Sequence, residues 1–214
     1  MSDVFQEVEE ELRRDRAAQL WKRYGNYLIG AALAIIIGTA GFVAWRDYRD
    51  RQAAEQGERF FAVAAEAAAG DVQKAIESAD QLARNSASGY AVLSRMIEAA
   101  LKDRAGDRDE SIAMYRSVAA DSSAPKELQD AARLLAALHS LEKIEPAELE
   151  RQLAPLQADR SAWRYSAIEL SALMAARTGE AAKARDLYKK IADDPGAPAG
   201  LRARAAEMIA VLGS

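Results

Sequence analysis

Cysteine is absent from this chain of 214 residues, and histidine occurs once, at His139. Without cysteine there are neither disulfide bonds nor thiolate-bound zinc, and a single imidazole lacks the partners that metal binding or nucleophilic catalysis requires. The phosphate-binding pattern GxxxxGKS/T does not occur either. Asp193 and Asp194 stand before Pro195 and Gly196, which predicts loop carboxylates and not a converging acid–base pair. We therefore predict a protein that is not an enzyme and has no catalytic, cofactor-binding or metal-binding residue.

An excess of positive charge is missing as well. The formal net charge is −4 and the pI is about 5.3, and no basic stripe interrupts this balance. Nucleic-acid binding therefore has no electrostatic basis in the sequence. Half of the residues are hydrophobic, so the chain has enough apolar surface to bury a core. Proteins are the class of partner that these exclusions leave.

One long stretch has no charge at all, the 22 residues from Tyr24 to Trp45. As a helix it would extend about 33 Å, close to the roughly 30 Å of a hydrocarbon core. Tyr24, Tyr27 and Trp45 stand where the aromatic belts of a membrane-spanning helix would lie. The sequence predicts a transmembrane helix over 24–45, a cytoplasmic juxtamembrane tail over 1–23 and a helical domain over 46–214.

A cleaved signal peptide is the main alternative for this apolar stretch. The 23 residues before it carry six acidic and five basic side chains, whereas the segment before a signal sequence is short and basic. No small-x-small cleavage pattern follows at Phe42–Arg46, so an uncleaved anchor is favoured. Five basic residues lie before the stretch and four lie within a comparable distance after it. By a small margin this count favours a cytoplasmic N-terminus, with the remaining domain outside the cytoplasm.

Three small residues share one face of the predicted anchor, because Gly30, Ala34 and Gly38 are spaced four residues apart. Faces of this kind let two membrane helices pack closely. Glycine and alanine are also ordinary constituents of membrane helices, so a helix-packing face is one of two interpretations.

After the anchor the apolar pattern is helical to the end, and no segment alternates with the period of two that a strand would show. Gly70, Gly106 and Gly179 each precede an acidic residue, which is ordinary chemistry for a turn between helices. These glycines are separated by 36 and 73 residues, so a further turn is expected near residue 142. A period of this length predicts an all-α solenoid of about four helix–turn–helix repeats. The predicted helices lie near 46–69, 72–84, 90–104, 108–121, 126–142, 146–154, 161–177, 180–192 and 199–212.

The second and fourth repeats resemble tetratricopeptide repeats. The second contains, in order, Ala99, Gly106, Ser111, Tyr115 and Pro125. The fourth contains the corresponding set, which is Ala172, Gly179, Ala184, Tyr188 and the prolines Pro195 and Pro198. The characteristic Trp and Leu of the first helix are missing, and the third repeat departs most from the pattern.

The arrangement of a short charged tail, one anchor and about four degenerate repeats resembles the bacterial ancillary Sec-translocon subunit (YfgM-like) family, which is grouped with the repeat domain of the cell-division coordinator. This resemblance implies a superhelix on the outer face of the inner membrane that binds the translocon, periplasmic chaperones or exported proteins. An alternative is a scaffold of an envelope or cell-division complex that acts by self-association.

Solenoids bind their partners through a concave groove lined by the first helix of each repeat. The repeat register places Met96, Asp103, Glu169 and Leu173 towards such a groove, although Met96 and Leu173 also fit the core between helices. Trp163 and Tyr165 are candidates for a binding hot spot, but we expect them to pack against the third repeat.

Overall fold

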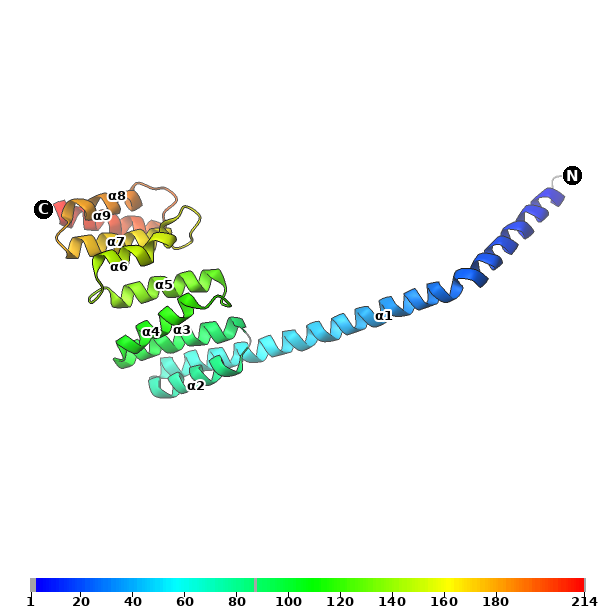
Figure 1. Ribbon diagram of the computed structural model, residues 1–214, viewed down its shortest axis with the longest axis horizontal. Helices are drawn as coiled ribbons and strands as arrows, with labels where there is room; N and C mark the ends of the chain where they lie inside the picture. The colour runs from blue at the N-terminus through cyan, green and yellow to red at the C-terminus, as the bar shows by residue number, and fades with distance from the viewer. Residues whose placement is uncertain (1–2, 87, 214) are drawn as a thin grey trace. The chain divides into compact units, whose positions relative to one another are not determined.

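The computed structural model describes residues 3–86 and 88–213, and it confirms the predicted all-helical fold: no strand occurs among these residues. Helices α2 to α9 follow one another side by side in chain order (Figure 1). The elements are α1 (Asp3–Ala69), α2 (Val72–Asn85), α3 (Ser88–Ala105), α4 (Arg108–Ala120), α5 (Lys126–Ser140), α6 (Pro146–Leu153), the short 3-10 helix η1 (Ala154–Gln157), α7 (Arg164–Arg177), α8 (Ala181–Ala192) and α9 (Ala199–Gly213).

The chain divides into two compact units, Met1–Glu55 and Gln56–Ser214, and α1 runs through this division. The predicted boundaries after residues 23 and 45 therefore lie inside one helix. That the membrane-spanning segment begins and ends at these boundaries stays a prediction. Within the described residues, α1 is the one helix long and apolar enough to cross a membrane. Its large apolar side chains are exposed, for example Ile35 and Ile37, each 69% exposed.

The second compact unit, here called the repeat domain, consists of four helix pairs and α9. We call the pairs the first to fourth repeats. The first repeat comprises α1 from Gln56 onward together with α2, the second α3 and α4, the third α5 and α6, and the fourth α7 and α8.

Three of the turns within repeats are the same structure. Gly70, Gly106 and Gly179 have φ values of 93°, 101° and 81°, a region that favours glycine because a Cβ would be strained there. In the first turn the amide of Asp71 donates to the carbonyl of Glu66 at 3.1 Å, which closes the preceding helix as a Schellman motif. The predicted glycine turns are thus present at all three places.

The residues after each turn keep one register. Ala75, Ser111 and Ala184 donate their amides to the carbonyl of the acidic residue that follows each glycine, and their side chains are fully buried. Leu149 makes the same amide bond to Glu145 in the third repeat and is equally buried, although no glycine precedes it. The third repeat therefore has the predicted architecture with a larger side chain at the same position.

The second and fourth repeats also end in the same turn. The backbone amide of Ser123 donates to Asp121, and the amide of Gly196 donates to Asp194. A side chain from the first helix of the repeat adds a second bond, from Arg95 at 2.6 Å and from Tyr165 at 2.9 Å respectively.

These bonds to the two closing turns favour ionised carboxylates. The Ser123 hydroxyl, Arg95 and the Ser123 amide lower the pKa of Asp121 to about 2, and the Gly196 amide and Tyr165 lower the pKa of Asp194. Their contribution to stability is therefore complete above the ordinary aspartate pKa near 3.8. For Asp121 it is lost as the pH falls through about 2.

The core is divided among the repeats, with one apolar cluster for each. Each cluster contains residues of one repeat together with residues from the first helix of the next. In the second cluster, for example, Tyr115 and Val118 of α4 pack with Ala132 and Ala136 of α5. Packing between neighbouring repeats therefore buries the apolar side chains of each repeat, as in other solenoids.

Candidate protein-binding surface

The first helices of successive repeats contact one another, from α3 to α5, from α5 to α7 and from α7 to α9. Residues at one position of these helices therefore lie on neighbouring elements. Seven residues before the turn glycine, Val63, Ala99 and Ala172 are buried against the second helix of their own repeat. Ala137 is buried in the same way in the third repeat. The residue that follows each of these four points outward.

The outward residues form what we call the exposed row. Leu138 and Leu173 are 45% and 38% exposed, and Ala64 and Ala100 are exposed as well. In α9 the corresponding residue is Val211, 66% exposed, which follows Pro198 at the same interval as Leu138 follows Pro125. The row is thus an aliphatic strip carried by five helices, with its largest side chains towards the C-terminal end.

The four predicted groove residues differ in their surroundings. Leu173 belongs to the exposed row, whereas Met96 is half-buried and packs against the cluster of the second repeat. Asp103 pairs with Arg108 at 3.1 Å and with His139 of the next repeat at 3.3 Å. The Asp103 carboxylate is therefore already paired with basic side chains of the same chain. Its role towards a partner stays a prediction.

Glu169, the fourth of these residues, forms two bonds with the guanidinium of Arg204 on α9, at 3.0 and 3.1 Å. This ion pair joins α7 to α9, so the Glu169 carboxylate already has a partner within the repeat domain. His139 lies in a similar junction, where its ring stacks on Tyr115 at 5.5 Å. Glu169 and His139 therefore contact neighbouring elements of the repeat domain, and the row itself is apolar.

Trp163 and Tyr165 have separate roles. Trp163 packs against the apolar cluster of the third repeat, as predicted. Tyr165 instead packs in the cluster of the fourth repeat and donates its hydroxyl to Asp194. The prediction for Tyr165 was wrong about its neighbour, because the closing turn supplies a carboxylate that the position in the sequence did not reveal.

The predicted anchor residues lie on the surface of α1. Tyr24, Tyr27 and Trp45 are 48%, 77% and 56% exposed, and the guanidinium of Arg49 lies 4.9 Å from the centre of the Trp45 ring. Gly30, Ala34 and Gly38 are also exposed, and a Cβ added at either glycine would meet no neighbouring atom within 4 Å. Their use as a helix-packing face stays a prediction.

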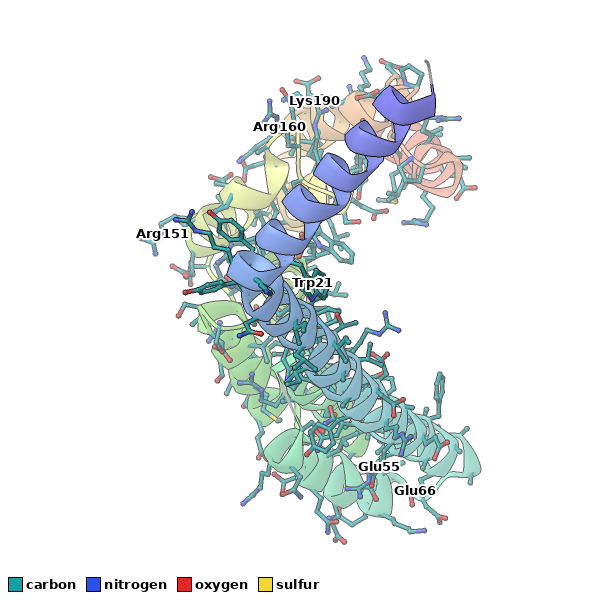
Figure 2. All side chains as sticks on the ribbon, turned by 90° about the vertical axis from the view of Figure 1, so that its right-hand side faces the viewer. Trp21, Glu55, Glu66, Arg151, Arg160 and Lys190 are labelled. Atoms are coloured by element: carbon teal, nitrogen blue, oxygen red, sulfur yellow. The ribbon has the colours of Figure 1, made fainter. Side chains whose placement is uncertain are left out.

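Charged side chains cover much of the remaining surface. Figure 2 shows Glu55 and Glu66 near the C-terminal end of α1, and it shows Arg151, Arg160 and Lys190 on the later repeats. Among the described residues, no group of three histidine, aspartate or glutamate side chains is arranged to hold a metal ion.

Leu138 and Val211 are the surface residues that the sequence-based assignment missed. The third repeat has no glycine turn from which to count, and no second helix follows α9 among the described residues. The signal that identifies both residues is their equal distance from Pro125 and Pro198, since each proline accepts the first amide bonds of the helix that follows.

The sequence matches one known protein family. The family described as tetratricopeptide repeat-like domain matches residues 18–205, which include the apolar stretch and most of the repeat domain. No curated protein and no solved structure matches the chain.

Proposed function

Because the chain belongs to the tetratricopeptide repeat-like domain family, we propose that it is a membrane-anchored adaptor that binds other proteins through the exposed row. The observation that carries this proposal is the exposure of Leu138 and Leu173 at the same position of neighbouring first helices. Aliphatic side chains in contiguous exposed positions are typical of surfaces that bind proteins. The family is typically one of protein-binding, non-catalytic domains, in agreement with the absence of any catalytic set in the sequence.

The anchor is the second part of the proposal. The apolar stretch has the length of a membrane span, and its aromatic residues stand at the two ends. The family match begins at residue 18, ahead of this stretch, which supports an apolar helix that belongs with the repeats. Anchoring raises the effective concentration of the row at membrane complexes, so weak contacts suffice for binding.

The partners that we propose are subunits of the Sec translocon, periplasmic chaperones or exported proteins. This finer assignment is supported by the order of charged tail, single anchor and degenerate repeats, which resembles the ancillary translocon subunit family. It requires the repeat domain to lie on the periplasmic side of the bacterial inner membrane.

Substitution in the row tests the binding surface. Full-length protein with Leu138→Asp and Leu173→Asp is purified from membranes in mild detergent, and co-purifying proteins are quantified by mass spectrometry. We expect the double variant to lose translocon subunits and chaperones by about tenfold, because charge enters the centre of the surface. The control is Ala113→Asp, at an exposed position of α4 outside the row. Equal recovery with both variants would remove the row from the proposal.

Topology is tested separately with single cysteines in this cysteine-free chain. Ser122→Cys lies in the exposed turn between α4 and α5, and Ala18→Cys lies before the apolar stretch. In intact cells a membrane-impermeant thiol reagent is expected to label the first variant and to label the second only after lysis. The opposite pattern would place the repeats in the cytoplasm and remove periplasmic partners.

A further inference from the structure

Each repeat after the first contacts its predecessor through one face of its first helix. The residues of that face belong to the apolar cluster of the preceding repeat. Figure 1 shows the resulting order, in which each first helix lies beside the second helix of the repeat before it. The larger side chains of these stacking faces are Ile97 and Leu101 in the second repeat, Leu135 in the third, Leu170 and Met174 in the fourth, and Met208 and Leu212 in α9.

The first repeat has the same face without a neighbour among the described residues. Counting from the turn glycine, Phe61 corresponds to Ile97, and Ala65 corresponds to Leu101. Phe61 is 73% exposed and Ala65 is exposed, whereas Leu101 is only 5% exposed. Phe61 is therefore exposed at a position where each later repeat, and α9, packs an apolar side chain against the preceding repeat.

Adjacent residues show that this exposure is specific to the face. The ring of Phe60 lies edge-on to Tyr90 of α3 at 6.2 Å and is half-buried. Phe61, the next residue, lies edge-on to Phe60 with the ring centres 6.3 Å apart, but is itself 73% exposed. Together with Glu58, Ala62 and Ala65, all exposed, it forms what we call the leading face of the repeat domain.

We propose that the leading face binds an amphipathic helix of a different protein, in the place that the second helix of a preceding repeat would take. The surface continues the stacking interface that joins the described repeats, so a helix is the occupant that its shape accommodates. The bound helix carries medium-sized apolar residues at i, i+3, i+4 and i+7, because Phe61 stands beside the small side chains of Ala62 and Ala65. It carries a lysine or arginine opposite Glu58.

Glu58 also distinguishes this occupant from a second copy of the chain. Two copies anchored in one membrane, as proposed above, would pair their α1 helices in parallel and bring Glu58 of one copy against Glu58 of the other. Like charges in that position oppose association, whereas a basic residue on another protein complements the glutamate. The leading face is therefore a surface for a foreign helix, separate from the exposed row.

The test places the photo-crosslinker p-benzoylphenylalanine at position 61 of the full-length protein in native membranes. We expect an adduct with one other polypeptide, mapped by mass spectrometry to a helical segment with the stated apolar pattern and a basic residue. Glu58→Lys is expected to reduce the adduct by about tenfold or more, because it replaces attraction by repulsion. The same crosslinker at Ala113, exposed on α4, is the positional control.

Two further variants separate docking from other effects. Phe61→Ser is expected to leave the melting temperature unchanged while a synthetic peptide of the mapped segment no longer binds. Leu173→Asp, in the exposed row, is expected to leave the adduct intact, so that failure of the row and failure of the leading face are distinguishable. The proposal is overturned by an adduct between two copies of the chain, by adducts with lipid alone, by equal adducts at both positions, by no adduct, or by insensitivity to Glu58→Lys.

Discussion

The junction between the first and second repeats differs chemically from the junction between the second and third. At the first junction α3 presents Ser94 and Glu98, which are 1% and 8% exposed. At the second junction α5 places Ala132 and Ala136 in the corresponding positions, 0% and 2% exposed. The backbone arrangement is shared, but one interface buries a hydroxyl and a carboxylate where the other buries methyl groups.

This difference implies unequal stability along the repeat domain. The Ser94 hydroxyl is buried with no hydrogen-bond partner among the described residues, and burial followed by the charge of Asp80 raises the pKa of Glu98. Unpaired buried polar groups cost free energy that alanine does not. In a solenoid, stability is close to a sum of repeat and interface terms, so the first junction is expected to open before the second.

The largest expected effect comes from giving the second junction the chemistry of the first. Ala136→Glu introduces a carboxylate at a site that is 2% exposed and lined by apolar side chains. We expect a loss of about 3–5 kcal/mol in the free energy of unfolding, since the charge has no partner. Urea unfolding of the full-length protein, followed by circular dichroism, measures it. Ala120→Glu on the exposed side of α4 is the control, and equal losses in both would show that burial is not the cause.

Truncation of stacking side chains compares an apolar junction with the polar one. Leu170, in the junction of the third and fourth repeats, is 7% exposed, and Leu170→Ala should cost about 3 kcal/mol. Ile97 is half-buried in the first junction, and Ile97→Ala should cost about 1 kcal/mol because less apolar surface is lost. Thermal unfolding of the two variants measures the difference. A larger loss for Ile97→Ala would reverse the proposed order of stability.

Ser94 and Ser171, two of the buried serines, are predicted to change stability in opposite directions when replaced by alanine. Ser94→Ala removes an unpaired hydroxyl and should stabilise the protein by about 1 kcal/mol. Ser171→Ala removes the acceptor of a 2.9 Å hydrogen bond from Gln157 and should destabilise it by about 1 kcal/mol. If both substitutions lowered the urea midpoint, the Ser94 hydroxyl would have a hydrogen-bond partner in solution, contrary to the prediction.

Glu98 should give the smallest effect, and one that depends on pH. Its raised pKa means that the folded protein favours the protonated form more than the unfolded chain does. The associated stability is fully present below the ordinary glutamate pKa near 4.5 and is lost as the pH rises through the higher pKa of the folded state. Glu98→Gln should therefore raise the melting temperature by a few degrees at pH 7 and leave it nearly unchanged at pH 4.

A melting-temperature increase for Glu98→Gln that is equal at pH 4 and pH 7 would contradict this assignment. The control is Glu110→Gln on α4, since Glu110 is exposed and pairs with Lys102 at 2.9 Å. Its substitution should remove a surface ion pair and produce no comparable stabilisation at pH 7.

Much of the fold could be predicted because its signals are local. The glycines at 70, 106 and 179 have the positive φ that their turns require, and the residues at the positions of Ser111 and Tyr115 are buried wherever the pattern predicts. The surface was harder to predict. Met96 and Asp103 were assigned to a groove by register, but register does not show that Met96 packs inward or that Asp103 contacts His139.

By itself the sequence determined the helical class, the positions of the glycine turns and the uncharged length of the apolar stretch. Each of these depends on residues close together in the chain, through backbone conformation or continuous hydrophobicity. The tertiary structure alone decided which side chains are covered by the next repeat. Leu138 is exposed while Leu134, four residues earlier on the same helix, is 9% exposed, because burial depends on a neighbour distant in the sequence. The same dependence leaves Phe61 exposed where Leu170 is packed.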